Sequence, residues 1–93
     1  MKIETVEIYS NTSNHAVLKL NDRSFPGSLI QGDSLSILVS EIAEAKAAIE
    51  VGENEEAKEI LTHVLEGLIE RLDIYTEVLK AHNIELPFTE KIA

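Results

Sequence analysis

The chain has 93 residues, a formal net charge of −9 and no cysteine. Its length predicts one small domain with a modest core, and the lack of cysteine excludes disulfides, thiolate zinc sites and thiol chemistry. Acidic and basic residues balance in residues 1–32, so residues 33–93 carry the whole negative charge, which disfavours nucleic-acid binding. Such a surface would attract a basic protein partner, although acidic helix surfaces more commonly serve only to keep a small protein soluble.

The first part of the chain is predicted to form strands. Residues 3–9 alternate and are rich in β-branched side chains, and the small polar residues 10–14 then predict a turn. Residues 15–20 alternate again, with Ala16, Leu18 and Leu20 on one side, and we expect the two strands to form an antiparallel hairpin. A short third strand is predicted at residues 28–31.

The period then changes to that of a helix. Apolar residues recur at steps of three and four from Leu35 to Val51, and Asp33 or Ser34 is the expected N-cap. Gly52 stands where a helix C-terminus needs a left-handed residue. The connection to the next helical stretch is short, which predicts an antiparallel helical hairpin.

A long amphipathic helix is predicted over residues 54–83. Its apolar stripe is wide, so we expect a neighbouring helix and a sheet to cover it. Gly67 inside this helix predicts a close helix–helix crossing, and Leu86 and Phe88 are expected to pack back on the core. The stripe consists of Ala57, Ile60, Leu61, Val64, Leu65, Leu68, Ile69, Leu72, Tyr75, Val78 and Leu79.

The predicted fold is therefore α+β: a small antiparallel sheet of about three strands packed on a two-helix antiparallel hairpin. We expect a single domain over residues 1–93, with strands and a loop in 1–32 and the helical hairpin and a tail in 33–93. The N-terminus shows no signal-peptide pattern and no apolar run reaches membrane-spanning length, so a cytoplasmic protein is expected.

No motif in the sequence predicts catalysis, a metal or a cofactor. His63 lies between Glu59 and Glu66 at helical spacing, which is more typical of a solvated ion pair than of a metal site. The stretch from Gly27 to Ser34 lacks the further glycines and the lysine of a phosphate-binding loop. We therefore expect no enzyme and no cofactor.

Two stretches carry a family resemblance. Residues 6–11 (VEIYSN) and 25–35 (FPGSLIQGDSL), together with the ending 75–88, resemble a family of small bacterial proteins of unknown function. The resemblance implies no activity. It implies a characteristic loop made of Arg23, Phe25, Pro26, Gly27, Gln31, Gly32 and Asp33.

Three functional hypotheses remain open. The first is a binding protein, in its most concrete form an immunity-type inhibitor of a basic bacterial toxin. The second is a structural or regulatory homo-oligomer, in which two hairpins pair into a four-helix bundle. The third is a ligand-binding or enzymatic domain centred on residues 23–34, with Tyr9 and Asn11 as further polar groups. For the first, the expected partner-binding residues are Glu55, Glu56, Glu59, Glu66, Glu70 and Asp73.

Overall fold

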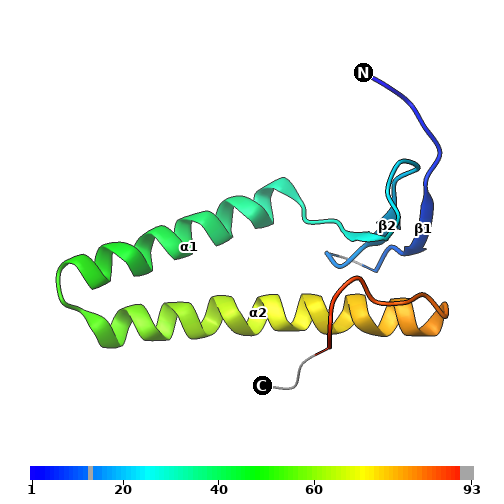
Figure 1. Cartoon of the computed structure of the whole chain (residues 1–93). Coiled ribbons are helices and arrows are strands. Elements are labelled where there is room, and N and C mark those ends of the chain that lie inside the picture. Colours follow the sequence, from blue (N-terminus) through cyan, green and yellow to red (C-terminus); the bar gives the residue numbers. More distant parts are fainter. Residues whose placement is uncertain (13, 91–93) are drawn as a thin grey trace. The chain divides into compact units, whose positions relative to one another are not determined.

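The computed structural model describes residues 1–12 and 14–90. Within these residues, three short strands precede two helices (Figure 1). The α+β prediction is confirmed. The predicted turn at residues 10–14 includes Ser13, which lies outside the described residues. The elements are β1 (Glu7–Ser10), β2 (Val17–Lys19), β3 (Gly27–Ser28), α1 (Gly32–Glu50) and α2 (Asn54–Ala81).

The chain divides into two compact units. We call the first the sheet unit; it contains residues 1–29 and the segment from Arg71 onward. The second, the hairpin unit, contains residues 30–70. The boundary falls inside α2, so the sheet unit takes the last part of that helix and the hairpin unit takes the first part.

The sheet is antiparallel with the strand order β1-β2-β3. Its strands are shorter than the alternating residues predicted, and β3 comprises only two residues. Pro26 has no backbone N–H to donate to a ladder, which limits how far β3 extends toward the N-terminus. A register shift between Ile8 and Ser10 interrupts the ladder between β1 and β2.

The core of the sheet unit joins β2 to the end of α2. Val17, Tyr75 and Leu79 are its buried members. Val17 is the buried residue of β2, so Ala16, Leu18 and Leu20 lie on the side of the strand that faces away from this core. The predicted packing of the C-terminal tail is confirmed, because Leu86 contacts the core and the Phe88 ring lies 6.2 Å from that of Tyr75.

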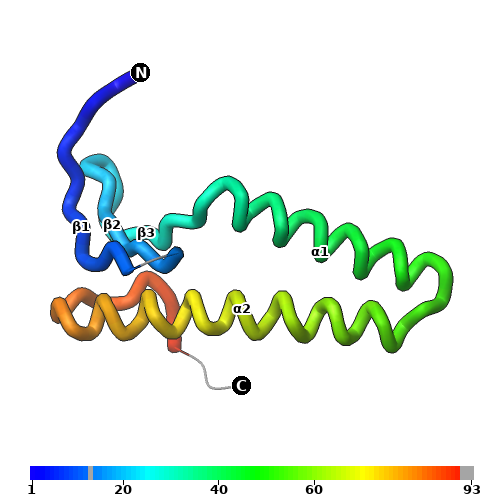
Figure 2. The backbone as a smooth tube through the Cα atoms, turned by 180° about the vertical axis from the view of Figure 1, so that it is seen from behind, coloured from blue at the N-terminus to red at the C-terminus, as the bar shows by residue number. Residues whose placement is uncertain are grey.

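In the hairpin unit, α1 and the first part of α2 run side by side in opposite directions (Figure 2). Gly52 makes the turn with a φ of +80°, as predicted. The N–H of Gly52 donates to the Ile49 carbonyl and the N–H of Glu53 donates to the Ala48 carbonyl. This pair of hydrogen bonds is the Schellman motif, which satisfies carbonyls at the end of α1.

The predicted helix cap is wrong. The helix α1 begins at Gly32, and its cap is Gln31, whose extended backbone presents a carbonyl to the N–H of Leu35. Asp33 therefore lies inside the first turn. Its carboxylate accepts a hydrogen bond from the N–H of Ser34 at 2.8 Å, and its charge favours the helix dipole.

The predicted close crossing at Gly67 is also wrong. A methyl group added to Gly67 would meet no atom of another element within 4 Å. The hairpin is tightest nearer the turn, where the buried side chains are small: Ala45, Ala48 and Ala57.

Candidate functional site

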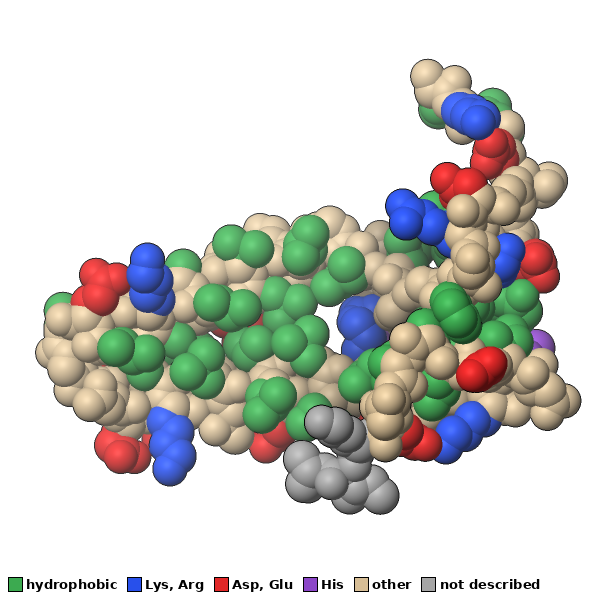
Figure 3. All heavy atoms as spheres, viewed as in Figure 1, with side chains coloured by type: hydrophobic (Ala, Val, Ile, Leu, Met, Phe, Trp, Pro, Cys, Tyr) green, Lys and Arg blue, Asp and Glu red, His purple; other side chains and the backbone are tan. Residues whose placement is uncertain are grey.

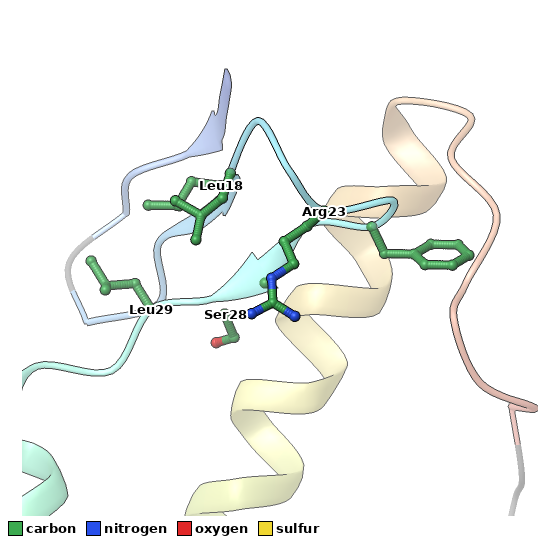
Figure 4. A pocket seen from close by; sticks show the side chains of 7 residues that line it. Leu18, Arg23, Ser28 and Leu29 are labelled. Atoms are coloured by element: carbon green, nitrogen blue, oxygen red, sulfur yellow. The ribbon is translucent and has the colours of Figure 1, made fainter. Parts of the chain in front are cut away.

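The first part of the characteristic loop lines a hollow on the sheet unit. The hollow has a volume of about 440 Å³, and its walls come from β2, the following turn and β3. The lining is mostly aliphatic and aromatic, and Arg23 is its charged member (Figure 4). The lining residues are Leu18, Leu20, Arg23, Phe25, Gly27, Ser28 and Leu29.

Two side chains of α2 hold this loop in place. The Tyr75 hydroxyl donates to the Pro26 carbonyl at 2.5 Å, and burial raises the pKa of that hydroxyl. The Arg71 guanidinium donates to the Leu29 carbonyl at 2.9 Å and to the Ser28 hydroxyl at 3.3 Å. These contacts span more than 40 residues of sequence, so no local pattern could predict them.

The chemistry of the hollow is limited. The Arg23 side chain extends toward Ser28 in Figure 4, but it is 72% exposed and its Nε lies 4.0 Å from the Asp22 carboxylate. The Ser28 hydroxyl accepts from the Arg71 guanidinium, and none of the residues that line the hollow is a histidine or carboxylate that could serve Ser28 as a general base. The arrangement can hold a small apolar group at the surface, and it contains no nucleophile–base pair.

The residues predicted for this loop divide between the two units. Arg23, Phe25 and Gly27 line the hollow, whereas Gln31, Gly32 and Asp33 form the start of α1. Pro26 is buried and is held by Tyr75. Tyr9, named with the loop, donates to Glu7 at 2.8 Å, and its ring packs edge-on against His82. The hydrogen bond to the Glu7 carboxylate is the main cause that raises the pKa of Tyr9.

The second candidate site is the hairpin unit, whose two helices meet along a seam. Every third or fourth residue is the least exposed on each helix, as expected for antiparallel helices in contact. The seam residues are Leu38, Glu41, Ala45 and Ala48 of α1, and Ala57, Ile60 and Val64 of α2.

One side of the seam is apolar on both helices. On each helix, the residue that follows a seam position points about 100° away from the seam. Because the two helices are antiparallel, the residues that follow seam positions on α1 and those that follow seam positions on α2 lie on the same side of the pair. Figure 3 shows the apolar side chains gathered across both helices of this unit. Between 41% and 61% of each residue is exposed. We call this the apolar face: Leu35, Val39, Ile42, Ile49, Leu61, Leu65 and Leu68.

A shallow hollow supports this assignment, because residues of both helices line it. Ile49 contributes from α1, and Leu61 and Leu65 contribute from α2. Near the turn, one lysine on each helix continues the three-and-four spacing of the apolar-face residues: Lys46 on α1 and Lys58 on α2. The prediction that the wide stripe of α2 is covered is therefore only partly correct: its seam side is covered and its apolar face is exposed.

The opposite side of the seam is acidic along α2. On this side, four glutamates each come one residue before a position with the three-and-four spacing of the seam. We call them the acidic stripe: Glu56, Glu59, Glu66 and Glu70. A hydrogen bond that the protonated Glu56 carboxyl donates to the Glu53 carboxylate, and then the charges of Glu53, Glu44 and Glu59, raise the pKa of Glu56. Like charges therefore lie close enough here to make the ionisation of Glu56 less favourable.

The structure brings four of the six predicted acidic residues together on this stripe. Glu55 lies one position further round the helix, and Asp73 belongs to the sheet unit. Residues 30–70 contain ten acidic residues and two lysines, so this unit alone has a net charge of −8.

His63 lies on the acidic side but does not pair as its sequence neighbours predicted. Its Nε2 lies 3.4 Å from the Glu41 carboxylate of the other helix. Glu41 is a seam residue and half-buried, so this contact joins the two helices. In the described part of the chain, no group of three histidine, aspartate or glutamate side chains is placed to hold a metal ion.

Comparison with known families identifies the chain. A family of unknown function, DUF6959, matches residues 1–88. The chain belongs to the DUF6959 family. This confirms the resemblance to an uncharacterised family, while the bacterial origin stays a prediction. The comparisons with curated proteins and with solved structures found no match. In the described residues, neither helix combines the length and apolar character needed to cross a membrane.

Proposed function

We propose that this chain is a non-catalytic protein-binding domain and that the apolar face of its hairpin makes the contact. The observation that carries the proposal is the exposure of seven aliphatic residues on one side of two helices. Half-exposed side chains of this size present roughly 600 Å² together, which is at the upper end of the apolar patches that monomers leave uncovered. Such a patch is typical of a surface that another protein covers.

The two sides of the hairpin suggest different partners. An aliphatic surface fits another aliphatic surface, whereas the acidic stripe fits a cationic one. The second candidate function is therefore the immunity-type inhibitor of a basic toxin, with the acidic stripe as its contact. The closeness of the acidic side chains around Glu56 favours it: after the hydrogen bond to Glu53, their charges help to raise the pKa of Glu56, and a cationic partner would relieve that repulsion. We place such an inhibitor in the bacterial cytoplasm, which the family resemblance and the lack of cysteine support.

A small-ligand or enzymatic role for the loop has less support. The charged group of its hollow is largely exposed to solvent, and the remaining loop residues shape a strand and a helix start. A buried apolar ligand site normally encloses most of its ligand, with a few convergent polar groups. The hollow offers one cation at its rim.

The test of the proposed function compares two matched pairs of substitutions. Ile42→Gln with Leu65→Gln makes the apolar face polar without adding charge, and Glu59→Gln with Glu66→Gln neutralises two acids of the opposite stripe. The wild-type chain and the two double variants are each tagged and used to capture proteins that bind them, including untagged copies of the chain. The proposal expects capture that the first pair abolishes and the second preserves. If only the second pair abolishes capture, the inhibitor function replaces binding through the apolar face. If neither pair changes capture, both proposed functions are wrong.

A further inference from the structure

We propose that a second copy of the chain covers the apolar face, with the two hairpins packed face to face and their helices opposed. The product is an antiparallel four-helix bundle. This inference rests on the proposed function, because it names the partner of the same surface. Three properties of the hairpin unit support it: the area of the face, the placement of charge, and the positions of two lysines.

The area of the face matches what a small stable dimer needs. Each copy contributes roughly 600 Å² of aliphatic surface. Two copies together would bury roughly 1,200 Å², which is the lower bound for specific, stable interfaces. The seven residues are spread over four turns of α1 and two turns of α2, so the surface is elongated and suits helix-on-helix packing.

The placement of charge favours a second copy over a charged partner. The unit has a net charge of −8, yet none of its ten acids occupies an apolar-face position. Packing the two faces together directs both acidic stripes outward, on opposite sides of the bundle, where water screens their repulsion. A strongly basic partner would be drawn to the acidic stripe instead, and the uncharged face would remain exposed.

The positions of two lysines favour one relative direction of the two copies. Lys46 and Lys58 continue the two stripes and lie near the turn at Gly52. If the two turns met at the same end of the dimer, four lysines would gather in one place and repel one another. If the copies run in opposite directions, two lysines lie at each end. In that arrangement α1 faces α1 of the partner, with Ile42 near the twofold axis.

Sedimentation equilibrium of the purified chain tests the partner. The chain mass is 10.3 kDa. We expect twice that mass at micromolar concentration, a return to the single-chain mass with Ile42→Gln and Leu65→Gln, and an unchanged dimer with Glu59→Gln and Glu66→Gln. Helical circular dichroism confirms that each variant is folded. A monomeric chain, or a dimer that survives the face substitutions in folded protein, overturns the inference. A monomer whose capture of another protein depends on the face leaves the proposed function standing.

Cysteine pairing tests the arrangement without disturbing most of the face. The chain has no cysteine of its own, so each introduced thiol is unique. Under mild oxidation Ile42→Cys is expected to form a disulfide-linked dimer. A mixture of Leu35→Cys and Ile49→Cys is expected to form mainly the mixed dimer, because opposed copies bring position 35 near position 49. Predominant 35–35 and 49–49 dimers, or no cross-link at any of the three positions, would overturn the arrangement.

Discussion

Removing the Tyr75 hydroxyl should destabilise the sheet unit measurably. Tyr75 is 6% exposed, and its hydroxyl donates to the carbonyl of buried Pro26. In Tyr75→Phe that carbonyl loses its partner, at a cost of about 1–2 kcal/mol, because a typical hydrogen bond contributes about 0.5–1.5 kcal/mol and an unsatisfied buried acceptor costs about 1–3 kcal/mol. For a domain of this size, each kcal/mol lowers the thermal midpoint by roughly 4–8 °C.

The assay is thermal or urea unfolding followed by circular dichroism, with Tyr9→Phe as the matched control. Tyr9 also loses a hydroxyl, but its acceptor is the exposed Glu7 carboxylate, so its midpoint should hardly change. The pH dependence gives a second check. Burial raises the pKa of Tyr75, so wild-type stability falls as the pH rises above 10, and the advantage over Tyr75→Phe shrinks there. Equal midpoints for Tyr75→Phe and wild type at pH 7 would refute the reasoning.

Three further predictions concern the hairpin unit. Gly67→Ala should raise the free energy of unfolding by about 1 kcal/mol, since the added methyl meets open space within a helix; a loss on urea unfolding would mean that α1 approaches closely there. Gly52→Ala should lower it by about 1–2 kcal/mol, because φ is +80°, and an unchanged midpoint would contradict the left-handed turn. Glu56→Gln should raise the melting temperature at pH 7. Its raised pKa means that protonation favours the fold, so this gain should disappear at a pH below the ordinary glutamate pKa; a gain that persists there would have another cause.

The helical hairpin could be predicted because its signals are local. Apolar spacing of three and four residues defines both helices, and a single glycine in the left-handed region defines the turn between them. The expected cap at Asp33 or Ser34 is wrong because α1 begins at Gly32, which moves the cap to Gln31. The backbone conformation of one residue sets where a helix begins, and several neighbouring residues have side chains that could cap it, so the sequence alone does not locate the boundary.

The candidate site could be predicted only in part. Periodicity showed that α2 has a wide apolar stripe, but it could not show which half of the stripe α1 covers. The contacts that shape the loop, from Tyr75 to Pro26 and from Arg71 to Leu29, join residues more than 40 positions apart. The His63–Glu41 contact likewise depends on the alignment of the two helices, which spacing within one helix does not determine.

The central claim, that another protein covers the apolar face, is tested most directly by the solvent exposure of its methyl groups. A soluble paramagnetic probe attenuates the NMR signals of exposed methyls, and Ile42 on the face can be compared with Ile8, which is 60% exposed on β1. As the chain concentration rises into the micromolar range, the account predicts that Ile42 becomes protected while Ile8 stays attenuated. Equal attenuation of both at every concentration, and with every captured protein added, would contradict the account.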